Sequence, residues 1–380
     1  MIERVALLGP APPDRGGIAR ETALLARELE KRVALTWLTY SRPYPAWLDP
    51  RRFDRHPNES APASARPALD YRSPGSWKRA AREIASTRPD ALVAPWWTSF
   101  WGLPLRSVLR KVRELSPETA RVLLCHNVRD HRSSVFERFL TLGAFFSADA
   151  FVVHAESDRE RLARRFRGRP IVVMPHPVVD APRPDRDRAR RDLGVTAPLV
   201  LFLGLIRRYK GVDLLLDAAP RIVGDTGAKI AVVGEVFPEA RFLERRLEAS
   251  PVRDSILWRD DYVSEEDMAR WLAAADAVVL PYRYVSGSGI AARAIAARRP
   301  LVAAAVGGLS QTVLPGSTGE LFAPGNPDAL AQAVGRVLAR GLPSYETGLT
   351  AAANERSWPR YADGLLSFLA AVKSRGRELR

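Results

Sequence analysis

Short apolar runs alternate with longer amphipathic stretches from one end of the chain to the other. Most runs are rich in Val, Leu and Ile without polar alternation, which is typical of strands buried on both faces of a parallel sheet. The stretches between them have apolar residues at helical spacing. This alternation predicts an α/β fold built from βαβ units. The predicted strands are residues 5–8, 33–38, 91–94, 122–125, 151–154 and 171–174, then 199–203, 230–233, 256–258, 277–280 and 301–304.

A polar stretch with several prolines and arginines, residues 178–198, separates the two sets of strands and is typical of a linker that runs into a short helix. We therefore predict two doubly wound, Rossmann-like domains that face a central cleft. The expected domains are residues 1–180 and 181–360, and residues 361–380 are expected to form a helix that packs back on the N-terminal domain. Residues 41–75, rich in proline, arginine and serine, predict a long irregular insertion.

Capping residues mark two helix starts. Ser264 precedes three acidic residues and then apolar residues at helical spacing. Asn326 is followed by Pro327, and proline suits the first position of a helix. Residues 358–372 also have the apolar spacing of a helix.

Length and composition fit a globular protein with more than one core. The 380 residues are about two to three times the usual length of a domain. Cys125 is the single cysteine, which excludes an intrachain disulfide framework and a cysteine-based structural zinc site. No apolar run approaches the ~20 residues that a membrane-spanning helix needs, so a soluble cytoplasmic protein is expected.

The chain has a formal net charge of +15, and residues 1–180, with 30 basic and 20 acidic side chains, carry +10 of it. A positive surface suits polyphosphates, anionic membranes or nucleic acid, because the long-range field does not distinguish among them. No nucleic-acid recognition motif accompanies the charge, so no nucleic-acid partner is predicted.

Candidate functional residues lie in loops that directly follow predicted strands, where doubly wound folds bind their ligands. The first such loop contains Gly16 and Gly17 at a helix start. Glycines there let backbone N–H groups approach an anion, although an ordinary turn is the alternative. The loop has neither a G-x-G-x-x-G nor a Walker A pattern, which disfavours nicotinamide binding and ATP hydrolysis.

A second loop, residues 204–211, has Arg207 and Lys210 in one strand-to-helix turn between two glycines. Fixed cations there would stabilise the negative charge that builds up on a departing diphosphate. A solvated basic turn is the alternative interpretation.

A third loop, residues 281–290, ends in small residues just before a predicted helix. These are Ser286, Ser288 and Gly289, followed by Ile290. Backbone N–H groups and hydroxyls at a helix start can form an anion cradle, although a tight turn that needs small residues would have the same sequence. Two phosphate-binding loops in one half point to a nucleotide-diphosphate ligand.

Glu235 and His126 also follow predicted strands. Glu235 could accept hydrogen bonds from a base or a ribose hydroxyl, and His126 could lie against a sugar; a structural hydrogen bond is the alternative for a single histidine. The other histidines near strand ends are His131, His154 and His176. Their spacing suits no metal motif, so no metal site is predicted.

An aromatic and basic strip lies in the first half. It consists of Trp96, Trp97, Phe100 and Trp101, followed by Arg106, Arg110, Lys111 and Arg113. The strip could bind a sugar or lie at a membrane surface. A buried aromatic corner beside a solvated helix face is the alternative.

These loops, in this order, resemble those of the GT-B glycosyltransferases, and more narrowly the retaining family 4 group. The matching segments of the second half are LFLGLIRRYKGVDLLLDA, AVVGE, DDYVSEEDMARWLAAADAVVLPYRY and SGSGIAARAIAARRPLVAAAVGGLSQTV. The first half matches in PAPPDRGGIA, LLCHNV and VVMPHPV. The resemblance covers nearly the whole chain.

The resemblance implies transfer of a sugar from a nucleotide-diphosphate donor to an acceptor hydroxyl, with no cofactor and no required metal. By this resemblance, Gly16 and Gly17 would approach the diphosphate or the acceptor, and His126 would lie near the donor sugar. Arg207 and Lys210 would lie at the diphosphate, and Glu235 near the nucleoside. Ser288, Gly289 and Ile290 would be backbone donors to the phosphates, with Ser286 beside them. The acceptor would be a saccharide or a lipid-linked saccharide in cell-envelope or polysaccharide synthesis. Basic surface would be attracted to anionic lipid at the inner membrane face.

One departure from the family pattern concerns two glutamates, eight positions apart, that hold the donor sugar and the ribose. The corresponding positions are Val285 and Arg293, and neither side chain accepts hydrogen bonds as a carboxylate does. Ser310 and Gln311 stand where the pattern commonly has Pro and Glu. A nucleotide-sugar-binding partner of another transferase, with weak or no activity of its own, is therefore the alternative function.

Overall fold

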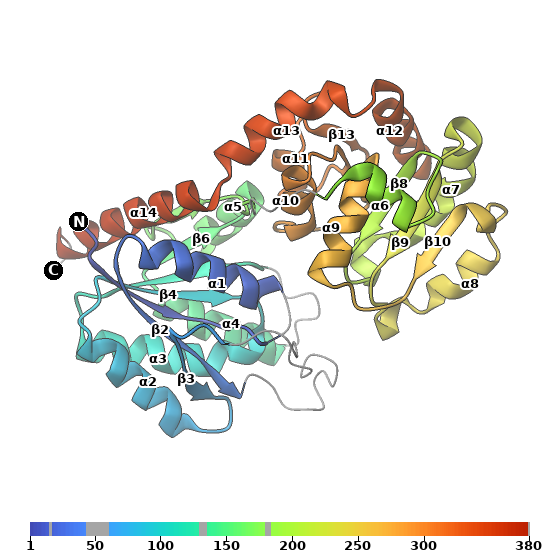
Figure 1. Ribbon diagram of the computed structural model, residues 1–380. Coiled ribbons are helices and arrows are strands. Elements are labelled where there is room, and N and C mark those ends of the chain that lie inside the picture. Colours follow the sequence, from blue (N-terminus) through green and yellow to red (C-terminus); the bar gives the residue numbers. More distant parts are fainter. Residues whose placement is uncertain (15–16, 43–60, 129–134, 179–183, 379–380) are drawn as a thin grey trace. The chain divides into compact units, whose positions relative to one another are not determined.

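The computed structural model describes residues 1–14, 17–42, 61–128, 135–178 and 184–378 (Figure 1). They form two compact units. The first consists of Met1–Met174 together with Trp358–Arg380, and the second is Pro175–Ser357. Each unit has its own parallel sheet.

The described residues of the first unit form a seven-stranded sheet in the order β3-β2-β1-β4-β5-β6-β7. The strands are β1 (Arg4–Leu8), β2 (Ala34–Arg42), β3 (Ala65–Asp70), β4 (Ala91–Trp96), β5 (Ala120–Cys125), β6 (Ala150–Val153) and β7 (Ile171–Val173). The connecting helices are α1 (Gly17–Glu30), α2 (Pro74–Ser86), α3 (Gly102–Leu115), α4 (Val135–Ser147) and α5 (Glu156–Arg165), and α14 (Trp358–Glu378) returns to this unit. The strand order reverses beside β1, as in other doubly wound sheets.

The second unit has a six-stranded sheet in its described part, in the order β10-β9-β8-β11-β12-β13. The strands are β8 (Leu199–Leu203), β9 (Lys229–Val233), β10 (Ile256–Arg259), β11 (Ala277–Leu280), β12 (Leu301–Ala304) and β13 (Gly319–Phe322). The helices are α6 (Arg186–Asp192), α7 (Val212–Thr226), α8 (Phe242–Glu248), α9 (Glu265–Ala274), α10 (Gly289–Ala296), α11 (Leu309–Thr312), α12 (Pro327–Arg340) and α13 (Pro343–Glu355). Here the order reverses between β8 and β11, which makes these two strands neighbours.

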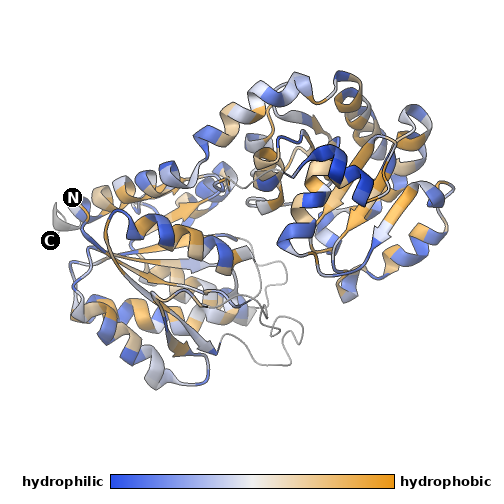
Figure 2. Ribbon diagram, viewed as in Figure 1, coloured by the Kyte–Doolittle hydropathy of each residue, from blue (hydrophilic) through white to orange (hydrophobic). Residues whose placement is uncertain are grey.

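The apolar runs of the sequence form the cores. All five residues of β8 and all four of β12 are 0% exposed. Figure 2 shows that the strands are mainly hydrophobic while the helices also carry hydrophilic residues.

The predicted strands are all present, with ends that differ by a few residues, so the prediction of two Rossmann-like α/β units is confirmed. Among the helices of the described part, none combines the length and apolar composition of a membrane span.

Two strands contradict the sequence-based expectation. The prediction of an irregular insertion at residues 41–75 is wrong where β3 pairs in parallel with β2, and α2 begins before that range ends. Strand β13 also lies outside the predicted set. Both are edge strands with a single neighbour, and such strands need less apolar sequence and tolerate a residue such as Pro67 of β3. Residues 43–60 of the expected insertion lie outside the described residues.

The predicted helix starts are confirmed. The amide of Asp267 donates to Ser264 Oγ at 3.0 Å at the start of α9, and the amide of Ala329 donates to Asn326 Oδ1 at 3.0 Å at the start of α12. Each cap satisfies an amide that has no partner within its helix. The short helix expected in the linker is α6.

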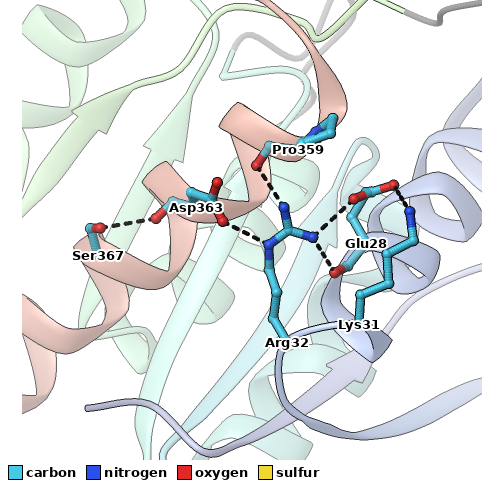
Figure 3. A network of polar contacts seen from close by, with 6 residues as sticks. All are labelled: Glu28, Lys31, Arg32, Pro359, Asp363 and Ser367. Carbon is cyan, nitrogen blue, oxygen red and sulfur yellow. Dashed lines mark hydrogen bonds and ion pairs between the residues drawn. The ribbon is translucent and has the colours of Figure 1, made fainter.

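Helix α14 packs against α1 and β5 of the first unit. Figure 3 shows the polar part of this contact, in which the Arg32 guanidinium donates to Asp363 at 2.6 Å and to the carbonyl of Pro359 at 3.4 Å. The hydrogen bond with Asp363 raises the pKa of Arg32. Farther along α14, Lys373 forms an ion pair with Asp90. The end of the chain is thus joined to the N-terminal sheet by packing and by ion pairs.

Candidate functional site

The loops after β8 and β11 touch each other because these strands are neighbours at the switch point of the second sheet. We call them the 204–211 loop and the 281–290 loop. Gly211 has a φ of +67°, and a Cβ at this position would lie 2.0 Å from the carbonyl oxygen of Pro281. Such a distance is far too short for any side chain. Glycine is therefore required where the backbones of the two loops meet.

Arg283 ties the two loops together. Its amide donates to the carbonyl of Tyr209 at 2.8 Å, and its guanidinium donates to the carbonyl of Arg208 at 3.0 Å and to Asp213 at 2.6 Å. Although burial opposes the shift, the Arg283 guanidinium holds the pKa of Asp213 below its ordinary value. The rings of Tyr209 and Tyr284 stack with their centroids 5.2 Å apart. These contacts make the two loops one connected structure.

The Lys210 ammonium lies where the loops meet. Its Nζ is 5.2 Å from the ring centroid of Tyr282. A Cβ built on Gly204 would lie 3.6 Å from Lys210 Nζ and 3.3 Å from Ile290 Cδ1, so the bare backbone of Gly204 faces both. Burial lowers the pKa of Lys210, and the charge of Arg207 lowers it further. A desolvated cation in this position is well suited to bind an anion.

Helix α10 begins at the same place. The amide of Ala291 donates to the Oγ of Ser288, which is buried and caps the helix, at 3.2 Å. Gly289 and Ile290 belong to the first turn, whose amides have no partner within the helix. The dipole of the helix adds partial positive charge there. Ser286, four residues before Ile290, is half-buried.

The side chain of Arg207 lies against the loop after β9. Its guanidinium carbon lies 3.9 Å from the ring centroid of Phe237, and its Nε lies 3.9 Å from a carboxylate oxygen of Glu239. The carbonyl of Glu235, in the same loop, accepts a hydrogen bond from the amide of Ile206 at 2.8 Å. The two predicted cations of the 204–211 loop thus have different neighbours, and Arg207 connects this loop to the one that carries Glu235.

Positions 285 and 293 have surroundings that the sequence could not reveal. Val285 is half-buried against the core, and its carbonyl accepts a hydrogen bond from the amide of Gly308 at 3.3 Å. Arg293 in α10 makes a bidentate ion pair with Glu265 at the start of α9, with nitrogen–oxygen distances of 2.7 and 2.9 Å. Position 293 therefore presents a cation that is held by a carboxylate from another helix.

A glutamate introduced at position 293 should destabilise the protein. In Arg293→Glu the new carboxylate would face Glu265, so an attraction is exchanged for a repulsion and the free energy of unfolding should fall by about 1 kcal/mol. The double variant R293E/E265R re-forms the pair in reverse and should recover most of this loss. Urea denaturation of the wild type and these variants measures both effects. A double variant no more stable than R293E would contradict the importance of the pair.

In the first unit, His126 follows β5 and is buried. Its Nδ1 lies 3.4 Å from Glu21 Oε2 of α1 and 3.2 Å from the Nε2 of His154, which follows β6. Gly17 is the first residue of α1, and a Cβ on it would meet no atom within 4 Å. Helix α1 thus connects the first glycine loop to the end of β5. The predicted residues that fall outside the described part are Gly16 and His131.

The aromatic strip is largely a buried corner of the first unit. Trp96 and Trp101 are 2% and 0% exposed. Trp101 stacks on Tyr40 at 4.1 Å between ring centroids, and Trp96 meets Phe145 edge to face at 5.0 Å. The suggestion that these two tryptophans bind a sugar or a membrane is therefore wrong. The basic residues that follow lie on α3, where Arg110 is exposed.

Sequence reasoning gave no functional role to three neighbours of the predicted residues. Tyr282 lies under the Lys210 ammonium, and Glu21 and His154 contact the ring of His126. Two of them had a detectable signal, since Tyr282 comes just after β11 and His154 just after β6, where ligand-facing residues of parallel sheets occur. Glu21 lies in the helix after the first glycine loop.

Comparison with known families agrees with this architecture. Residues 197–340 match the family model described as Glycosyl transferases group 1, and residues 15–181 match the model described as Glycosyltransferase Family 4. A D-inositol 3-phosphate glycosyltransferase of Pseudarthrobacter chlorophenolicus is 27% identical over 361 residues, which are 84% of this chain and 83% of the relative. A D-inositol 3-phosphate glycosyltransferase of Geodermatophilus obscurus is 34% identical over 240 residues, which are 59% of this chain and 53% of the relative.

Solved structures have the same fold. Sucrose-phosphate synthase from Thermosynechococcus elongatus is similar with a TM-score of 0.77 and 19% identity, over 98% of this chain and 100% of that one. Anabaena Alr3699/HepE, solved in complex with UDP, is similar with a TM-score of 0.73 and 15% identity, over 97% and 100%. The matched families, the two parallel sheets and these structures agree, and the chain belongs to the GT-B glycosyltransferases of the family 4 group.

Proposed function

We propose that this glycosyltransferase moves a sugar from a nucleotide-diphosphate donor to an acceptor hydroxyl with retention of the anomeric configuration. Lys210, Arg207 and the first turn of α10 would hold the diphosphate. The observation that carries the proposal is the approach of Lys210 Nζ and Ile290 to the bare backbone of Gly204. It combines a desolvated cation with a helix N-terminus, and both favour a phosphate group.

The proposed reaction is a front-face displacement. As the bond between the anomeric carbon and the diphosphate oxygen breaks, negative charge builds up on the diphosphate, and Lys210 and Arg207 stabilise it. The acceptor hydroxyl attacks the same face and passes its proton to the departing diphosphate oxygen. No protein carboxylate is needed as a base in this mechanism. Glu235 would accept hydrogen bonds from the nucleoside.

The decisive experiment offers the purified chain a panel of nucleotide-diphosphate sugars that differ in base and sugar. Transfer or slow hydrolysis of one donor, with release of the nucleoside diphosphate, is expected. The anomeric configuration of the product, read by NMR, should equal that of the donor. A product with inverted configuration would exclude front-face displacement, and failure to bind any donor would remove the proposed function.

Turnover should not depend on a divalent metal, because fixed cations of the protein would neutralise the diphosphate. We expect the rate with the preferred donor to stay the same in excess EDTA, measured as release of the nucleoside diphosphate. A loss of rate that added Mg²⁺ or Mn²⁺ restores would contradict this part of the proposal.

The acceptor proposed here is an anionic saccharide or polyol, or a lipid-linked saccharide of the cell envelope. The first half of the chain carries +10 of the +15 net charge, which would attract an anionic acceptor or an anionic lipid surface at the inner membrane face. The relatives named D-inositol 3-phosphate glycosyltransferases support a phosphorylated polyol as the first acceptor to test. D-inositol 3-phosphate, unphosphorylated inositol and a lipid-linked saccharide form the acceptor panel.

A nucleotide-sugar-binding partner without activity is the second candidate. The observation in its favour is the Arg293–Glu265 ion pair, since it occupies a position at which active relatives are expected to present a carboxylate to the ribose. Calorimetry separates the two functions. Tight binding of a nucleotide sugar, without hydrolysis and without transfer to any acceptor of the panel, would support the function of an inactive binding partner.

A further inference from the structure

Two polar side chains of the first unit, Glu21 and His154, lie against the buried imidazole of His126. Glu21 comes from α1, His126 from the end of β5 and His154 from the end of β6. His126 and His154 are 8% and 3% exposed, so their ring nitrogens depend on protein partners and on any bound ligand.

The tautomer of His154 follows from its contact with the backbone. Its Nδ1 lies 2.8 Å from the carbonyl oxygen of Met174. A carbonyl oxygen only accepts hydrogen bonds, so Nδ1 of His154 must carry the proton. In the neutral ring Nε2 then has the lone pair and accepts.

The tautomer of His126 follows in turn. Its Nδ1 lies 3.2 Å from the Nε2 of His154 and 3.4 Å from the Oε2 of Glu21. Both atoms are acceptors, so a proton on Nδ1 is attracted by both. A lone pair on Nδ1 would instead face a second lone pair and a carboxylate. The neutral ring of His126 therefore has its proton on Nδ1 and its lone pair on Nε2.

We infer that Glu21 and His154 are positioning residues that hold His126 in the Nδ1–H tautomer, so that Nε2 accepts a hydrogen bond from a substrate hydroxyl. Neither residue needs to touch the substrate itself. The identity of that hydroxyl as a sugar hydroxyl rests on the proposed function. The tautomer does not rest on the proposed function, because it is inferred from the contacts of His126 Nδ1 with His154 and Glu21.

The tautomer can be read directly by NMR. Long-range ¹H–¹⁵N correlation spectra of the full chain, labelled at histidine, distinguish a pyrrole-type from a pyridine-type nitrogen in each ring. Spectra of single histidine variants assign the signals. We expect His126 in the wild type to have a pyrrole-type Nδ1 and a pyridine-type Nε2. A wild-type His126 with the proton on Nε2, or on both nitrogens at neutral pH, would overturn the inference without any variant.

Variants of His154 test its positioning role. In His154→Phe the ring loses an acceptor, and with Glu21→Gln added it also loses the carboxylate. We expect the Nε2–H form of His126 to become populated in these variants. His154→Gln offers an amide oxygen in place of Nε2 and should restore the wild-type tautomer. An unchanged His126 spectrum in the double variant would overturn the role of both residues.

Kinetics connect the tautomer to the substrate. We expect kcat/KM for the preferred nucleotide sugar to fall about tenfold in His154→Phe, which corresponds to ~1.4 kcal/mol, and to recover in His154→Gln. An altered tautomer with unchanged kcat/KM would overturn the contact between Nε2 and the substrate. If the wild type turns over no nucleotide sugar, the proposed function fails, while the NMR spectra still decide whether Glu21 and His154 set the tautomer.

Discussion

Lys210→Ala should lower kcat/KM for the nucleotide-sugar donor by about 10²- to 10³-fold while the protein stays folded. The expected size is that of losing one well-placed electrostatic donor, roughly 3–4 kcal/mol of transition-state stabilisation. Lys210 is the cation for this role because its Nζ lies against Gly204 and 5.2 Å from the ring centroid of Tyr282, and because burial lowers its pKa. Most of the loss should appear in kcat, since the charge on the diphosphate grows as the bond breaks.

The matched control is Arg208→Ala, which removes an exposed cation from the same loop. Its backbone carbonyl, which receives the hydrogen bond from Arg283, is retained. Steady-state kinetics and circular dichroism of both variants are the measurements. Equal losses in the two variants would mean that general basicity matters, and an unchanged rate in Lys210→Ala would remove this residue from the mechanism.

The same lysine should lower the stability of the fold at neutral pH. Burial lowers its pKa, which means that the folded state disfavours the ammonium relative to the unfolded chain. The neutral variant Lys210→Met, which keeps the length of the side chain, should therefore be at least as stable as the wild type below the ordinary pKa of lysine. Any gain should vanish as the pH rises above that value, because the amine is then neutral in both states.

The strands and their order of appearance could be predicted because parallel sheets are buried on both faces, so their strands are unbroken apolar runs. Two of the four edge strands were missed, although the other two, β7 and β10, were predicted from their apolar runs. Strand β3 pairs on one side only and contains Pro67, and β13 begins with Gly319, so neither has an apolar run long enough to be recognised. At an edge, where one side of the strand is unpaired, proline, glycine and polar residues are tolerated, and in β3 and β13 they interrupt the apolar pattern that identifies a strand.

The candidate site could be located to its loops but not to its contacts. Lys210 and Ile290 follow β8 and β11, and the adjacency of those strands brings them together. The partner of Arg293 was beyond sequence reasoning, because Glu265 is 28 residues away and its position depends on the geometry of α9 and α10. The same is true of Glu21 and His126, whose contact depends on how α1 packs over its sheet.

Gly211→Ala should be the most destabilising change at the junction of the two loops. An alanine there must adopt a φ near +67°, which costs about 1–2 kcal/mol for an L-residue. Its Cβ would also lie 2.0 Å from the carbonyl oxygen of Pro281, so the backbones of the 204–211 and 281–290 loops must move apart. Overpacking of this kind costs roughly 1–3 kcal/mol more, which gives a total of about 2–5 kcal/mol.

Gly227 at the end of α7 provides the comparison, because its φ is +65° and a Cβ there would meet no atom within 4 Å. Gly227→Ala should therefore cost only the conformational part, about 1–2 kcal/mol, and leave the kinetics unchanged. Gly211→Ala should also lower kcat/KM, since separating the loops moves Lys210 away from the start of α10. Urea denaturation of both variants measures the losses of stability, and kinetics with the nucleotide-sugar donor measure the effect on kcat/KM. Equal losses of stability would show that the left-handed backbone, and not the close approach to Pro281, is what requires glycine at position 211.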